Sequence, residues 1–223
     1  MEKNFDFNYQ FNFSHEEHLN GIDLSNWFRY YHIIKEVIAL KPKKILEIGA
    51  GNEIVKNCLK DFTEDYKVMD INTKLEPDIL SDLRELKPEL RERFDCLICA
   101  DVLEHMPFDD LEKNLKNIYD YLKKRGKAII TIPHRRARIM IVSPLSYQEA
   151  KIIELPSWIK SSPGSFFKQV IQKNIWIDPN HFWEIGNGRV EVKDIEKIIK
   201  KVGFDIDKFK KILQVDFWVL NKK

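Results

Sequence analysis

Short apolar runs alternate with amphipathic segments through the middle of the chain. The runs are of strand length, and the segments between them carry apolar residues at the spacing of a helix. The predicted strands cover residues 43–48, 66–70, 78–83, 94–100 and 127–132. Since parallel strands need a crossover connection, this alternation predicts a parallel sheet with helices on both faces.

The two ends of the chain extend this pattern. A helix is predicted from Asp23 or Ser25 to about residue 40, with Ser25 as a candidate cap and Pro42 beyond its end. Near the C-terminus, a helix over 190–202 ends at Gly203, and residues 204–210 and 213–221 then predict two antiparallel strands.

Aromatic residues occupy every second position near the start of the chain. Phe5, Phe7, Tyr9, Phe11 and Phe13 follow this period, which predicts a strand or an extended arm over residues 1–18 with one aromatic face. We expect the arm to pack on the domain. A cover over a pocket and a contact in a dimer are the alternatives.

Residues 135–177 interrupt the alternation after the fifth predicted strand. They are rich in apolar residues but broken by Pro144, Pro156 and Pro163, and we interpret them as two or three short helices. A segment at that end of a sheet is well placed to form a substrate cap. The lysines mixed into it leave a second interpretation open, an amphipathic surface that lies on a membrane or holds a lipid-like acceptor.

Composition and charge exclude several classes of protein. The 223 residues carry a net charge of +2, which does not suggest a dedicated nucleic-acid binder. Cys58, Cys96 and Cys99 are too few for a disulfide framework, and the last two would point to opposite faces of one strand. No apolar run is long enough to span a membrane, and the N-terminus is not a signal peptide. We therefore expect a cytoplasmic protein.

The first predicted strand runs into a glycine turn, Glu47-Ile48-Gly49-Ala50-Gly51. A dinucleotide fingerprint needs a third glycine where this chain has Ile54, and no Lys-Ser/Thr pair is present for a P-loop. The acid at the end of an apolar strand requires a cationic partner. The turn therefore suits a ligand that has an ammonium group and a nucleoside but no phosphate.

This turn resembles motif I of the class I S-adenosylmethionine-dependent methyltransferases, although many members have a third glycine at the position of Glu53. Leu103-Glu104-His105 followed by Pro107 resembles a second motif of the family, and the turn around Asn180 and His181 resembles a third. The order of elements over residues 43–134 also matches.

The resemblance implies S-adenosylmethionine as the cofactor and assigns it a set of contacts. Glu47 would hold the ammonium group, while Gly49 and Gly51 admit the ligand's backbone. Asp70 stands about 20 residues beyond the first glycine, where an acid can accept hydrogen bonds from a ribose. Ile71 would cover one adenine face, Asp82 and Leu83 would bind its edge, and Ala100 and Asp101 would border the methionine end. Asp82 could instead cap a helix over 83–92, and Arg29, Tyr30 and His32 are further candidates to face the ligand.

Two histidines are candidate general bases for an acceptor that must lose a proton, His181 first and His134 second. Arg135, Arg136 and Arg138 could bind a phosphate or carboxylate of the acceptor. Asp101, Glu104 and His105 have the residue types of a metal site. The preferred interpretation assigns no metal, but an RNA methyltransferase with a metal at these three residues is an alternative. A non-catalytic scaffold of the same fold is another.

The sequence thus predicts a single domain over residues 1–223, with a Rossmann-like, seven-stranded, mostly parallel sheet and an inserted helical cap. Its parts are an arm and helix (1–42), a cofactor-binding core (43–134), a substrate cap (135–177) and a final helix with antiparallel strands (178–223). The predicted activity is methyl transfer to a small-molecule acceptor, anionic or lipid- or sugar-like. The oligomeric state is not predicted.

Overall fold

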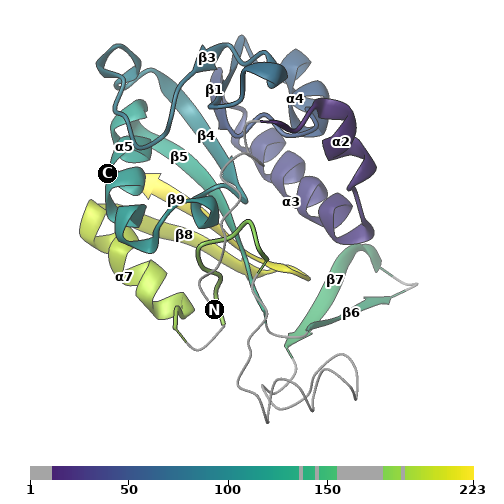
Figure 1. Cartoon of the computed structure of the whole chain (residues 1–223). Coiled ribbons are helices and arrows are strands. Elements are labelled where there is room, and N and C mark those ends of the chain that lie inside the picture. The colour runs from purple at the N-terminus through teal and green to yellow at the C-terminus, as the bar shows by residue number, and fades with distance from the viewer. Residues whose placement is uncertain (1–11, 136–137, 144–145, 155–177, 187–188) are drawn as a thin grey trace.

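The computed structural model describes residues 12–135, 138–143, 146–154, 178–186 and 189–223 (Figure 1). A seven-stranded sheet forms its centre, with the strand order β3-β2-β1-β4-β5-β9-β8. In this order the strands from β3 to β5 are parallel, and β9 runs antiparallel to both of its neighbours, β5 and β8, as the sequence predicted for the two C-terminal strands. The strands are β1 (Lys44–Ile48), β2 (Asp65–Asp70), β3 (Ile79–Leu80), β4 (Phe94–Ala100), β5 (Leu122–Pro133), β8 (Phe204–Lys211) and β9 (Val215–Lys222).

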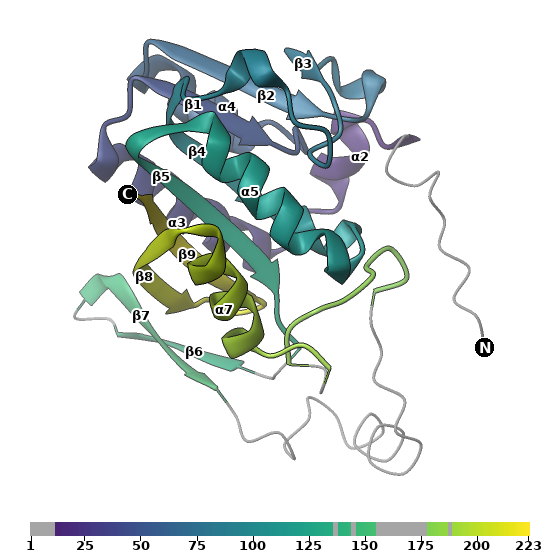
Figure 2. The same ribbon diagram turned by 90° about the vertical axis from the view of Figure 1, so that its left-hand side faces the viewer.

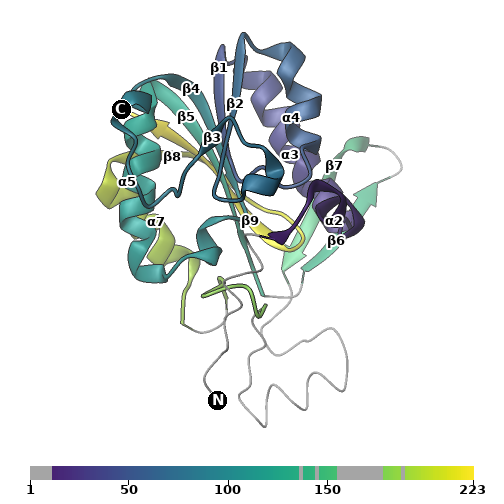
Figure 3. The same cartoon turned by 45° about the horizontal axis from the view of Figure 1, so that its top comes forward.

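Helices cover both faces of the sheet (Figure 3). On one face lie α3 (Leu24–Leu40) and α4 (Ile54–Leu59), and on the other lie α5 (Leu111–Tyr121) and α7 (Val192–Val202). Strands β1, β4, β5 and β9 each supply alternate side chains to two separate apolar cores. Cys96 packs into the core under α3, whereas Cys99 packs into the core under α5, which confirms that the two thiols lie on opposite faces.

Two helix ends differ from the predicted details. Asp23, not Ser25, caps α3, because its carboxylate accepts a hydrogen bond from the Asn26 N–H at 2.8 Å. For the segment after the glycine turn, the apolar spacing predicts a helix over residues 54–62 with Val55, Cys58, Leu59 and Phe62 facing inward. In the structure Cys58 is exposed and Phe62 is 66% exposed. The regular part of this helix is only six residues long, and the following turn is a 3-10 turn with another spacing.

The predicted extended conformation of the N-terminal segment is wrong over residues 15–18, which are helical. Residues 1–11 lie outside the described part of the chain, but His15–Asn20 form a short helix, α2, and not an extended arm. Ser14 caps this helix, and Glu17 completes a capping box by accepting from the Ser14 N–H at 2.7 Å. The alternation of aromatic residues therefore does not continue into this segment as a strand.

The prediction of helices across 135–177 is also wrong in its first part. Residues Arg138–Ser143 (β6) and Ser146–Glu154 (β7) pair as an antiparallel hairpin beside the β8–β9 turn (Figure 2). Ile139 and Ile141 point outward and are about half exposed, so the apolar residues here follow the period of a strand. Residues 155–177 lie outside the described part of the chain. No helix among the described residues is long and apolar enough to cross a bilayer.

Candidate functional site

A cavity of about 520 Å³ opens at the carboxyl ends of β1, β2 and β4. This is the edge where the strand order reverses, between β1 and β4, and ligands of open parallel sheets bind there. The nine residues predicted to contact the cofactor all line this one cavity. They are Glu47, Gly49, Gly51, Asp70, Ile71, Asp82, Leu83, Ala100 and Asp101.

The two glycines of the turn are needed for different reasons. Gly49 has φ +90°, and a Cβ on it would lie 2.7 Å from the Val102 Cγ2 atom, so the fold itself excludes a side chain here. Gly51 has φ +47°, but a Cβ on it would meet nothing within 4 Å. The space beside Gly51 therefore remains open for a ligand to approach the backbone.

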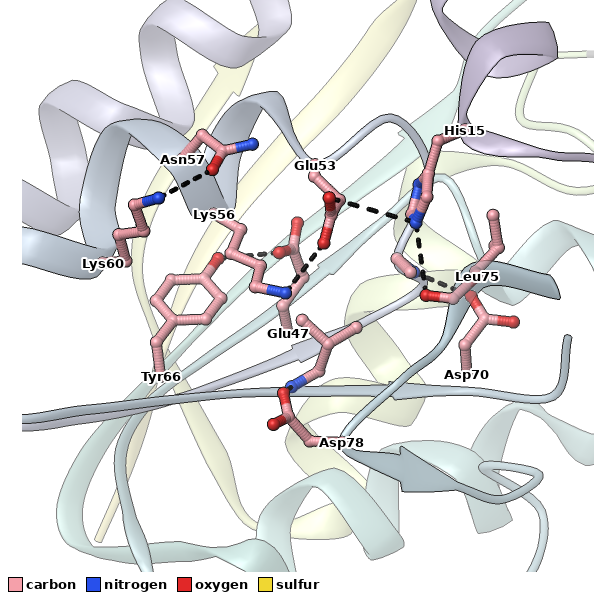
Figure 4. A network of polar contacts seen from close by, with 12 residues as sticks. His15, Glu47, Glu53, Lys56, Asn57, Lys60, Tyr66, Asp70, Leu75 and Asp78 are labelled. Carbon is pink, nitrogen blue, oxygen red and sulfur yellow. Dashed lines mark hydrogen bonds and ion pairs between the residues drawn. The ribbon is translucent and has the colours of Figure 1, made fainter. Parts of the chain in front are cut away.

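Glu47 is a buried acid whose charge is not paired. Its carboxylate accepts a hydrogen bond from the Tyr66 hydroxyl at 2.7 Å, and its residue is 7% exposed. The nearby Lys56 ammonium instead pairs with Glu53 (Figure 4). Among the described residues, Glu47 forms no ion pair, and burial raises its pKa to about 7. A ligand cation at this position would satisfy the carboxylate.

Asp70 is held by the backbone on both sides of the turn. One carboxylate oxygen accepts from the Ala50 N–H at 2.7 Å and the other accepts from the Asn72 N–H at 2.8 Å. Each oxygen of a carboxylate has a second acceptor site. The carboxylate is therefore fixed in position and still able to accept two hydroxyl hydrogen bonds.

Asp82 lies at the far end of the cavity, after β3. It accepts from the Arg84 N–H at 2.8 Å and pairs with the Arg84 guanidinium. Burial alone would raise the pKa of Asp82, but the bonds and charge from Arg84 exceed that effect and lower it. Residues 83–92 contain only a 3-10 turn at Pro88–Leu90, so Asp82 does not cap an α-helix there.

Helix α3 closes the side of the cavity beside β4. Asp101 has φ +54° and accepts from the Thr131 hydroxyl at 2.6 Å, and the Arg29 guanidinium pairs with its carboxylate. Arg29 also lies over the Tyr30 ring, 5.1 Å from its centroid. Of the three candidates on this helix, Arg29 and Tyr30 line the cavity, whereas His32 is not among its lining residues.

The segment around α2 packs on the domain over the glycine turn, in keeping with the expectation that the N-terminal segment packs on the domain, although the sequence did not indicate the helix or its contacts. The His15 Nδ1 atom lies 2.7 Å from the Gly51 carbonyl oxygen, and Nε2 lies 3.2 Å from that of Leu75 (Figure 4). The Asn72 side chain donates to the Phe13 carbonyl at 2.8 Å. The capping box at Ser14 was the available signal for this helix, but nothing in the sequence indicated where it would pack.

Three titratable residues meet at the end of the cavity beyond Asp101. Glu104 follows β4 and is fully buried, and burial raises its pKa to about 8. His105 contacts the Asn180 carbonyl oxygen through Nδ1 at 3.0 Å, and burial lowers its pKa to about 4. His181 lies against His105 with ring centroids 4.8 Å apart. The His181 Nδ1 atom is 2.5 Å from a carboxylate oxygen of Glu184, which pairs with Arg135.

The position of His134 does not fit the predicted role of a base. Its side chain is 1% exposed, does not line the cavity, and contacts the Asp216 carboxylate through Nδ1 at 2.5 Å. The Arg138 guanidinium is buried in the same cluster, where it donates to the carbonyls of Ile212 and Val215 and pairs with Asp216. These contacts connect the start of β6 to β9. Arg138 is thus not available to an acceptor, and Arg136 lies outside the described residues.

Comparison with known proteins gave one family and many similar structures. A family model described as a methyltransferase domain matches residues 27–208. The N-methyltransferase NodS from Bradyrhizobium japonicum, solved with S-adenosylhomocysteine, is 10% identical with a TM-score of 0.61, over 96% of this chain and 95% of that one. Magnesium protoporphyrin IX methyltransferase from Synechocystis, with the same ligand, is 14% identical with a TM-score of 0.59, over 90% and 84%. At these identities the likeness shows a shared fold. The search of curated proteins gave no match.

Proposed function

The chain belongs to the class I S-adenosylmethionine-dependent methyltransferases, and from this premise we propose that it methylates a small-molecule acceptor at the His181 end of its cavity. The observation that carries the proposal is the convergence of nine residues, drawn from four strand ends, on one cavity of about 520 Å³. That volume lies within the usual range of small-molecule sites.

The proposed position of the cofactor follows from the charges in the cavity. The methionine ammonium group pairs with Glu47, whose buried carboxylate has only a hydroxyl as partner. The ribose hydroxyls donate to Asp70, which its two backbone bonds already orient. The adenine lies between Ile71 and the Asp82–Leu83 edge. The sulfonium and its methyl group then lie near Ala100 and Asp101, facing His105 and His181.

The reaction needs positioning more than acid–base chemistry. A nucleophilic atom of the acceptor attacks the methyl carbon in line, the bond between sulfur and methyl breaks, and S-adenosylhomocysteine leaves as a neutral thioether. Holding two reactants in the attack geometry can lower the barrier by roughly 7–11 kcal/mol. The small-molecule class of acceptor is supported by the size of the cavity, about 520 Å³, and by a net charge of only +2, which offers little attraction for a polyanion.

Calorimetry with S-adenosylmethionine and S-adenosylhomocysteine tests the proposal. We expect one site per chain for each ligand, and Asp70→Asn to weaken both about 10- to 100-fold, because a hydrogen bond to a charged group contributes roughly 1.5–3 kcal/mol. Asp65→Asn, at the opposite end of the same strand, is the matched control and should bind like the wild type. Absence of binding by the folded wild-type chain would favour the scaffold alternative and contradict the proposal.

A further inference from the structure

We propose that Glu104, His105 and His181 bind one divalent transition-metal ion at the acceptor end of the cavity. The residues come from two segments more than 70 positions apart, the turn after β4 and the loop before α7. One potential ligand atom from each lies within 4.8 Å of the others. Bonds of about 2.0–2.2 Å to a common ion would bring such atoms to roughly 3–4 Å apart. The ligand atoms would therefore need to approach one another by no more than about 1–2 Å to share one ion.

Glu104 supplies an independent reason to expect a cation. It is 0% exposed, and neither carboxylate oxygen has a hydrogen-bond partner among the described residues. The His181 Nε2 atom lies 3.9 Å from a carboxylate oxygen of Glu104, which is beyond hydrogen-bonding distance. Burying a carboxylate without a partner is costly. A metal ion held between Glu104 and the two imidazoles would supply the missing charge.

A second layer of contacts orients the imidazole of His181. Its Nδ1 atom faces the buried Glu184 carboxylate at 2.5 Å, and Arg135 pairs with that carboxylate in turn. An Nδ1–H donated to Glu184 leaves the lone pair of Nε2 directed toward Glu104. Metal-binding histidines are commonly fixed by such a carboxylate. His105 is held in a similar way, through Nδ1 and the Asn180 carbonyl.

The donor set indicates the class of metal and its role. Two imidazoles and one carboxylate suit zinc, iron, cobalt or manganese better than magnesium or calcium. Three protein ligands leave coordination positions open, and His105 and His181 line the cavity, so these positions face it. An acceptor oxygen bound there would be polarised beside the methyl donor. This role rests on the proposed function, whereas metal binding itself does not.

The site differs from the metal-binding alternative that the sequence left open. In that alternative Asp101 is a ligand with Glu104 and His105, but its carboxylate is engaged by Thr131 and Arg29. His181 takes that place. The Nε2 atom of His181, predicted to accept a proton as a base, would then be a metal ligand.

Titration with Co²⁺ and Zn²⁺ tests the site without any methyl transfer. After treatment with a chelator, the full chain should bind one Co²⁺ ion, detected by calorimetry and by visible absorption of the bound ion. We expect Glu104→Gln and His181→Gln each to weaken binding at least tenfold. Glu184→Gln, which leaves all three proposed ligands in place but removes the charge that orients His181 and pairs with Arg135, should weaken it by about 10–100-fold.

Two matched controls and two measurements keep the outcomes distinct. Cys58→Ser removes an exposed thiol, Glu112→Gln removes an exposed acid, and both should bind Co²⁺ like the wild type. Thermal unfolding of each metal-free variant shows whether it is folded. If Glu104→Gln is not folded, the variants of His181 and Glu184 carry the test. Two results would overturn the inference. Either the wild-type chain does not bind one ion per chain, or the folded variants of the proposed ligands bind the ion as tightly as the wild type does. If the metal-binding inference fails but the chain still binds S-adenosylmethionine in the presence of chelator, the proposed function is unaffected.

Discussion

The buried carboxyl group of Glu47 leads us to predict that the affinity for S-adenosylmethionine rises with pH between about pH 6 and pH 7. Burial raises the pKa of this acid to about 7, so it is mostly protonated at pH 6. The ammonium group of S-adenosylmethionine pairs only with the carboxylate form, and binding must therefore release a proton. The sign follows directly: a rising pH ionises Glu47 and strengthens binding, and a falling pH weakens it.

The size of the effect follows from the same pKa. About 9% of Glu47 is ionised at pH 6 and about half at pH 7, which gives roughly a fivefold gain in affinity. The ligand's own amino group, with a pKa of about 7.7–8.0, remains mostly protonated over this range. Calorimetry in two buffers of different ionisation enthalpy should also detect about 0.9 proton released per ligand at pH 6.

Glu47→Gln isolates the contribution of the charge. The amide oxygen can still accept from Tyr66, but the affinity should lose its dependence on pH between 6 and 7. Glu53→Gln is the comparison variant, because Glu53 also lines the cavity but already pairs with Lys56. It should keep a rise of affinity with pH, smaller than in the wild type because the Glu53 charge helps to raise the pKa of Glu47. Equal wild-type affinity at pH 6 and pH 7, or an unchanged slope in Glu47→Gln, would refute the assignment of the ammonium group to Glu47.

Two further predictions concern stability, measured by urea unfolding without ligand. Gly49→Ala should lower the free energy of unfolding by about 2–4 kcal/mol, since a left-handed backbone and a crowded Cβ both oppose a side chain, whereas Gly51→Ala should lose only about 1–2 kcal/mol. Equal losses would show that contact with Val102 is unimportant. Asp216→Asn should cost about 3–5 kcal/mol, because it removes the buried carboxylate that pairs with Arg138 and contacts His134 and leaves Glu154 as the one acid beside the Arg138 guanidinium among the described residues, yet cofactor affinity should not change. A weaker affinity in a folded Asp216→Asn chain would contradict the separation of this cluster from the cavity.

The fold was predictable where the spacing of apolar residues along the sequence matches the side chains that the sheet buries. Residues 43–134 alternate between short apolar runs and helical spacing, and each run became a strand of the central sheet. The sequence does not predict the hairpin of β6 and β7, because the apolar content of residues 135–177 and the prolines between its apolar runs favour short helices separated by breaks. The alternation of Ile139 and Ile141 was the available signal for a strand.

Some residues of the candidate site could likewise be predicted from the sequence, and others could not. Residues predicted to contact the cofactor sit directly after strands, so the sheet itself brings them together at one edge. Contacts between distant segments could not be predicted from spacing. Arg29 reaches Asp101 across 72 positions, and His134 meets Asp216 across 82, because packing of α3 and pairing of β5 with β9 place them.

A crystal structure of the full chain with S-adenosylhomocysteine tests the central claim most directly. The account predicts that the ligand's amino group lies within hydrogen-bonding distance of Glu47 and that its ribose hydroxyls contact Asp70. It also predicts that the sulfur points toward Asp101 and His181. A nucleoside bound elsewhere, or a reversed ligand with its amino group away from Glu47, would contradict it.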